Sequence, residues 1–96
     1  MDDALHARLR ALPGGDAVAE GLDDLERGDA TVAALLVSIG AARLARAGLR
    51  VPRALDDPEK RLYAALAASD EDSAHGRYNA WIRRLVSCER ALECGS

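Results

Sequence analysis

The chain has 96 residues, and no linker rich in Pro, Gly or Ser divides it, so the sequence predicts one domain over residues 1–96. Hydrophobic residues make up 49% of the chain but aromatic residues only 3%, which predicts a core built from Leu, Val and Ile. The net charge of −3 argues against a general affinity for nucleic acids, because nonspecific binding comes mainly from neutralising phosphates. A chain this short leaves about a third or more of its unfolded surface exposed after folding, so we expect self-association.

Apolar residues recur at helical spacing through almost the whole chain, and no alternation of period two competes with this pattern. A first helix carries Leu5, Leu9 and Leu12 on one stripe and ends at the breaker Pro-Gly-Gly of residues 13–15. A second helix is predicted from Asp16, whose carboxylate would cap the first turn, to Gly28, which would end it in a left-handed conformation.

The segment 30–47 is predicted to form a third helix at the centre of the fold. It is apolar around most of its circumference, as is normal for a helix surrounded by others. Its uncharged part, residues 30–42, is too short for a membrane span, which needs about 20 residues. Gly40 is unfavourable inside a helix and therefore predicts a close helix crossing or a bend, and Gly48 would close the helix.

Residues 57–59, Asp-Pro-Glu, give the most specific local signal in the chain. They combine a capping carboxylate, a proline at the first helical position and an acid at the positive end of the helix dipole. A fourth helix therefore begins at Pro58, and its buried face is predicted to contain Leu62 and Leu66, with Tyr63 partly offset.

A fifth helix begins within residues 70–73 and is predicted to be the longest. Residues 69–72 resemble a capping box, but no true breaker lies there, so the fourth and fifth helices could also be continuous. An apolar stripe about 120° wide follows along the fifth helix. Because the stripe is longer than a small core can cover, we expect it to be an interaction surface for a second copy or another protein. Its residues are Tyr78, Trp81, Ile82, Leu85, Cys88 and Leu92.

Cys88 and Cys94 are predicted to be free thiols. Their spacing puts them on different faces of a helix, which prevents an unstrained disulfide, and it matches no usual zinc spacing. Free thiols indicate a reducing compartment, and the acidic N-terminal sequence is unlike a secretory signal. We therefore expect a cytoplasmic protein that holds no metal.

Charge alternates along the chain: segments 30–53 and 73–96 are basic, and the rest is acidic. This pattern favours attraction between neighbouring elements, with an arginine-rich face for an acidic partner as the alternative. Arg77 and Arg84 lie two turns apart on one face, beside aromatic residues, and could form an anion-binding ridge. The alternative is that both are ordinary solvent-exposed arginines that pair with Glu or Asp elsewhere, since this interpretation is compatible with the same spacing.

The arginines of the predicted third helix raise the question of a helix-turn-helix DNA reader. If Gly40 were the turn, these arginines would follow it as a reading helix requires. The segment 41–48 is short and rich in Ala, however, and it lacks Asn, Gln, Ser and Thr to read base edges. The residues concerned are Arg43, Arg46, Arg50 and Arg53.

His75 is the one plausible acid–base residue, because Asp72 and Tyr78 lie three residues before and after it on the predicted helix. Such neighbours could orient an imidazole for proton transfer. No Ser, Cys or second acid stands at a diagnostic distance, so a small enzyme built on His75 ranks third among the functions considered. His6 is expected at the surface beside Asp2, Asp3 and Arg10.

Together these patterns predict an all-α fold, a compact single-domain bundle of about five helices, with the third central and buried against the fifth, which is the longest. We expect a noncatalytic interaction module that self-associates through the stripe of the fifth helix. A nucleic-acid-associated regulator using the arginines of the third and fifth helices is the alternative. No cofactor and no membrane association are expected.

Overall fold

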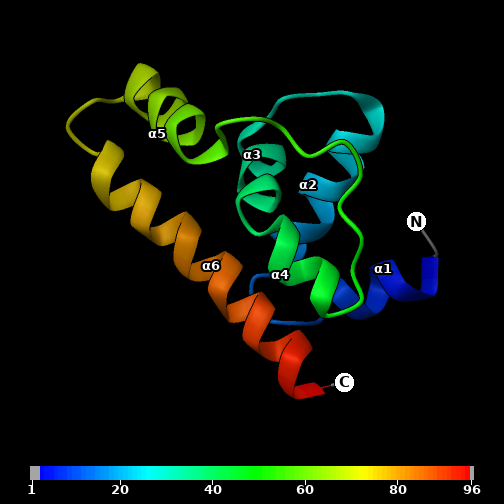
Figure 1. Ribbon diagram of the computed structural model, residues 1–96. Helices are drawn as coiled ribbons and strands as arrows, with labels where there is room; N and C mark the ends of the chain where they lie inside the picture. The colour runs from blue at the N-terminus through cyan, green and yellow to red at the C-terminus, as the bar shows by residue number, and fades with distance from the viewer. Residues whose placement is uncertain (1–2, 96) are drawn as a thin grey trace.

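Six helices and no strand make up residues 3–95, the part of the chain that the computed structural model describes (Figure 1). The predicted all-α fold is confirmed, and there is one more helix than predicted because the third is divided at Gly40. Among these six, none is both long enough and apolar enough to cross a bilayer. The helices are α1 (Asp3–Arg10), α2 (Gly15–Arg27), α3 (Val32–Ile39), α4 (Ala41–Arg46), α5 (Pro58–Ser69) and α6 (Ala74–Gly95), the longest.

The centre of the bundle is α3, as predicted. Its residues 33–38 are all buried, and Leu36 and Val37 are completely enclosed. α3 packs chiefly against α2 and α5, and its contact with the C-terminal helix α6, which was expected to be its main neighbour, is smaller. Gly21 makes the close approach of α2 possible, because a Cβ atom there would lie 2.3 Å from the carbonyl oxygen of Ala33.

Both explanations that the sequence suggested for Gly40 apply: a bend in the helix and a close crossing with another helix. The helix changes direction there, with α3 ending at Ile39 and α4 beginning at Ala41 (Figure 1). Gly40 also faces α6 closely, since a Cβ atom would lie 2.7 Å from Glu89 Oε2 and 2.8 Å from Leu85 Cδ1. The break leaves Arg43 exposed beyond the core and places Leu44 inside it.

The corner between α2 and α3 is held by hydrogen bonds. Gly28 ends α2 in the predicted left-handed conformation with φ 81°, and its N–H donates to the carbonyl oxygens of Asp24 and Leu25. Thr31 caps α3, because its hydroxyl oxygen accepts from the N–H of Ala34 at 3.1 Å, and the same hydroxyl donates to Asp24 Oδ2 at 2.5 Å. The start of α3 thus lies further along than the predicted position directly after Asp29.

Two predicted helix caps are wrong. α2 begins at Gly15, and the Asp16 carboxylate accepts only from the N–H of the next residue, at 2.9 Å. α5 begins at Pro58 as predicted, but Asp57 has a left-handed backbone with φ 47°, and its side chain makes no cap hydrogen bond. Asp16 therefore lies inside the first turn of α2 and not before it, and the left-handed backbone of Asp57 differs from the extended one of an ordinary cap.

α5 and α6 are separate helices. Asp70 is extended at the end of α5, and its carboxylate accepts from the N–H of Asp72 at 3.2 Å. The predicted capping box is therefore wrong, because Ser69 belongs to the last turn of α5 and α6 begins only at Ala74. The connection folds α5 and α6 into a hairpin on one side of the bundle (Figure 1).

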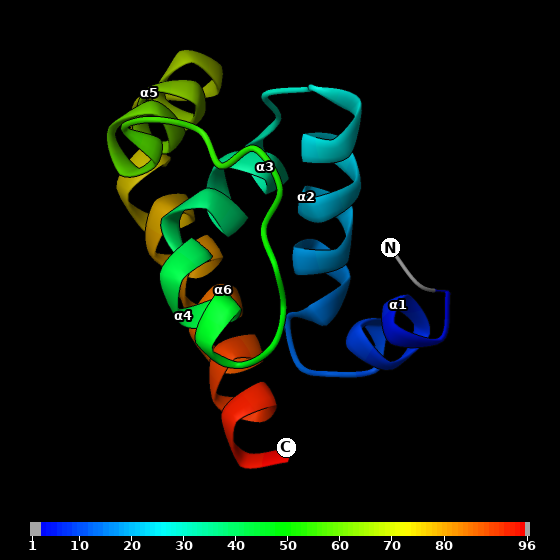
Figure 2. The same cartoon turned by 45° about the vertical axis from the view of Figure 1, so that its right-hand side comes forward.

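A long connector, residues 47–57, joins α4 to this hairpin and runs along the length of the bundle (Figure 2). Leu49 anchors it in the core. Further along, the hydroxyl oxygen of Ser38 in α3 accepts a hydrogen bond from the N–H of Leu55 at 3.0 Å. The same hydroxyl donates a hydrogen bond to the carbonyl oxygen of Ala34 at 2.8 Å. These two points fix the connector against α3.

Candidate functional site

Two tyrosines meet where α5 packs on α6. The rings of Tyr63 and Tyr78 have centroids 5.7 Å apart and are tilted by 54°, a favourable aromatic arrangement. Tyr63 was expected at the margin of the buried face of α5, but it is 41% exposed and is the one exposed large apolar side chain among the described residues. Burial raises the pKa of Tyr78, and the negative charge of Glu59 raises it further, so this hydroxyl stays protonated at neutral pH.

The six residues of the predicted apolar stripe divide into two groups. Leu85 and Cys88 are buried in the core of the single chain, so they cannot contact a partner while the fold is intact. The other four are half-buried and pack against the core from outside; they are Tyr78, Trp81, Ile82 and Leu92. Burial also raises the pKa of the Cys88 thiol to about 11, with Glu89 adding to the effect, so the thiol is protonated and unreactive at neutral pH.

The predicted anion ridge is only partly assembled. The guanidinium carbon of Arg84 lies 4.8 Å from the centroid of the Trp81 ring, a cation–π contact. The turn before α2 packs on the same part of α6, because a Cβ atom at Gly14 would lie 2.1 Å from the carbonyl oxygen of Arg84. Arg77 is exposed two turns earlier on α6. The ridge therefore combines one stacked and one solvated guanidinium.

The two histidines have different surroundings. His75 is exposed, and its Nε2 lies 3.3 Å from Asn79 Nδ2 rather than beside Asp72. His6 is half-buried between α1 and α2, with Nε2 at 3.0 Å from Asp23 Oδ2 and Nδ1 accepting from Arg10 Nε at 3.3 Å. The expectation that His6 is a surface residue is therefore wrong. Asp2 and the side chain of Asp3, its other two expected neighbours, lie outside the part of the chain that the structure describes.

Sequence reasoning missed the buried acid Glu89. It lies on α6 opposite the break at Gly40, only 4% exposed, with Arg43 Nη1 at 3.8 Å from its Oε1. Burial raises the pKa of Glu89; the positive charge of Arg43 opposes this shift and the nearby Glu93 adds to it. The helical pattern of α6 could have revealed Glu89, because it falls between Leu85 and Leu92 on the buried face.

The arginines of the predicted reading helix do not lie on one helix. Arg43 and Arg46 belong to α4, which has only six residues, and they line a polar pocket with Glu93. Arg50 and Arg53 lie in the connector, where Arg53 has a left-handed backbone with φ 50°. Gly40 alone separates α3 from α4, whereas a helix-turn-helix needs a turn of several residues.

Within residues 3–95, no three His, Cys, Asp or Glu side chains come together as metal ligands would. Comparisons with protein families, with curated proteins and with solved structures gave no match. The functional argument therefore depends on the surface of this chain alone.

Proposed function

We propose that this chain is a small noncatalytic interaction module that pairs with a second copy of itself through the α5–α6 hairpin. The observation that carries the proposal is the pair formed by Tyr63 and Tyr78, an exposed aromatic surface at the junction of two helices. Aromatic residues are enriched in protein interfaces because they bury a large area with few rotatable bonds. Contact between the rings holds both side chains in place before a partner arrives.

The order of charges along the hairpin supports a second copy as the partner. The connection between α5 and α6 is acidic, whereas Arg83 and Arg84 lie further along α6. In an antiparallel two-fold pairing centred on Tyr78, the acidic connection of one copy lies toward the basic part of α6 in the other copy. Opposite charges placed in this way favour association and fix its register.

Two unpaired thiols support a reducing compartment, and we include a cytoplasmic location in the proposal. Cys88 is buried and Cys94 is exposed, and neither forms a disulfide. An exposed free thiol persists most readily where glutathione and thioredoxin keep cysteines reduced.

Light scattering over a concentration series tests the proposed pairing. We expect the mass of the wild-type chain to rise from the 10.2 kDa of one copy toward twice that value at high micromolar concentration. Tyr63→Glu should keep the chain at the mass of one copy, because pairing would desolvate the new charge. Ala7→Glu, which adds the same charge on the exposed side of α1, is the matched control and should pair like the wild type. A wild-type mass that stays at one copy would contradict the proposal.

Binding of single-stranded nucleic acid is a second candidate function, favoured by the stacking of Arg84 on Trp81 with Arg77 nearby. Such a site would use the guanidinium groups for phosphates and the ring edge for a base. If it operates, the wild-type chain should shift a single-stranded oligonucleotide at low salt, and Arg77→Ala combined with Arg84→Ala should abolish the shift. An unshifted band with the wild type would reject this candidate.

A further inference from the structure

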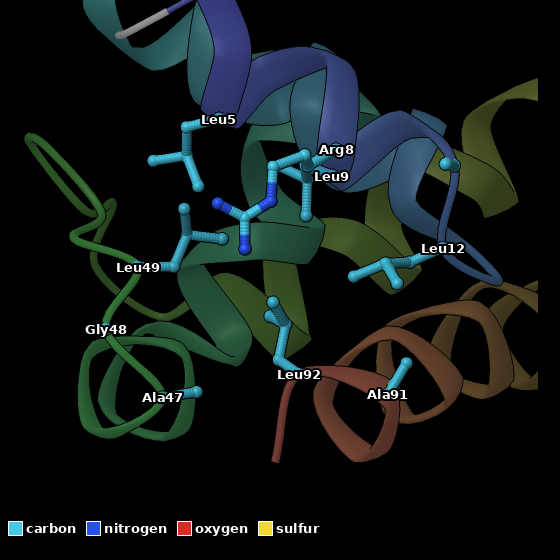
Figure 3. Close-up of a pocket in the computed structure, with 10 residues that line it drawn as sticks. Leu5, Arg8, Leu9, Leu12, Ala47, Gly48, Leu49, Ala91 and Leu92 are labelled. Carbon is cyan, nitrogen blue, oxygen red and sulfur yellow. The ribbon is translucent and has the colours of Figure 1, made fainter. Parts of the chain in front are cut away.

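A pocket of about 390 Å³ lies between α1, the C-terminal end of α4 and the last turns of α6 (Figure 3). Its volume falls within the range of about 300–1,000 Å³ that is usual for small-molecule sites. It is at the opposite end of the bundle from the start of α6, so it is independent of the proposed pairing surface (Figure 1).

Leucines from distant parts of the sequence make the pocket apolar. Leu5, Leu9 and Leu12 line it from α1 and the following turn, Leu49 from the connector and Leu92 from α6. Figure 3 shows these side chains directed toward a common space. Such a lining favours an aliphatic or aromatic group over water.

Arg8 is the one charged residue among those that line the pocket. Its guanidinium extends into the space between Leu5 and Leu49 (Figure 3). Among the described residues, no carboxylate lies within ion-pair distance of it, although the chain is acidic overall. An unpaired guanidinium at an apolar pocket complements a carboxylate that carries an apolar body.

We propose that this pocket binds a medium-chain aliphatic carboxylic acid, with the chain among the leucines and the carboxylate on Arg8. Both halves of the ligand are needed: the leucines supply the apolar burial, and the guanidinium supplies two parallel N–H donors for the two carboxylate oxygens. The exposed position of Arg8 lets the carboxylate keep contact with water while it binds.

Calorimetric titration with octanoate and octanol tests this site, since the two probes share an apolar chain and differ in the carboxylate. Octanoate should bind the wild type about tenfold more tightly than octanol, the factor expected for a charged hydrogen bond. Arg8→Gln should reduce octanoate binding to the level of octanol. Ala91→Phe, which fills the pocket from α6, should weaken both probes.

Arg83→Gln is the matched control, because it removes an exposed arginine of α6 that does not line the pocket, and it should bind octanoate like the wild type. Three results would overturn the proposal. They are no octanoate binding by the wild type, equal binding of octanol and octanoate, and octanoate binding that Arg8→Gln leaves unchanged. Because none of these titrations depends on Tyr63, their outcome is separate from that of the pairing experiment.

Discussion

Replacing Gly21 with Ala is expected to lower the free energy of unfolding by about 3 kcal/mol, the upper end of the usual cost of overpacking a core. A Cβ atom at this position would lie 2.3 Å from the carbonyl oxygen of Ala33 and 2.8 Å from Val37 Cγ1. The carbonyl oxygen belongs to the backbone of α3 and cannot turn away as a side chain could. α2 and α3 would have to separate, and the leucines between them would lose contact.

Gly76→Ala provides the matched control, because it is the same chemical change on an open surface. A Cβ atom at Gly76 would meet nothing within 4 Å, and the residue lies in α6, where Ala is favoured over Gly by about 1 kcal/mol. Urea denaturation followed by circular dichroism should show a lower midpoint for Gly21→Ala and a slightly higher one for Gly76→Ala. Equal midpoints for Gly21→Ala and the wild type would contradict the close contact of α2 and α3.

Replacing Glu89 with Gln is expected to stabilise the chain at neutral pH by about 1–2 kcal/mol, because burial disfavours the charged carboxylate and the exposed guanidinium of Arg43 stays solvated without it. Burial raises the folded-state pKa of Glu89 above its ordinary value of 4.5, and Arg43 only partly opposes this. As pH rises from 4.5 toward the raised pKa, the unfolded chain loses the proton first, so the wild type loses stability across that interval. Glutamine has no proton to lose, and its advantage should therefore be full at neutral pH and vanish in acid.

Arg43→Gln separates the effect of the ion pair from that of burial. Removing the guanidinium leaves Glu89 buried without its opposite charge, which should lower stability at neutral pH by up to about 1 kcal/mol. Below the ordinary pKa of 4.5 the loss should disappear, because Glu89 is then protonated in both states. Thermal unfolding of both variants between acidic and neutral pH is the measurement. If the difference in stability between Glu89→Gln and the wild type did not depend on pH, burial would not be what raises the pKa of Glu89.

The parts of the fold that depend on neighbouring residues could be predicted from the sequence. Gly28 ends its helix because only a left-handed residue closes that turn, and Pro58 begins one because its missing N–H is not needed there. The apolar circumference of residues 33–38 likewise indicated a central helix. Each of these signals lies within a few residues of the structure it specifies.

The parts that depend on distant contacts could not be predicted. Asp16 and Asp57 have the residue type of a cap, but Asp16 lies inside the first turn of α2 and Asp57 has a left-handed backbone, so neither side chain caps its helix. The apolar pocket brings Arg8 together with Leu49 and Leu92, and no local pattern relates positions so far apart. The exposure of Tyr63 could not be predicted either, because it depends on how α5 is rotated against α3 and α6.

The connector of residues 47–57 also determines whether the α5–α6 hairpin packs on the α3 of its own chain or on the α3 of a neighbouring chain. It spans the bundle from the end of α4 to the start of α5, and this length is what lets α5 return to the α3 of its own chain (Figure 2). The α3 of a neighbouring chain offers an identical surface to the hairpin. A chain with a shortened connector could no longer reach its own α3, and two such chains would exchange hairpins in a domain-swapped dimer.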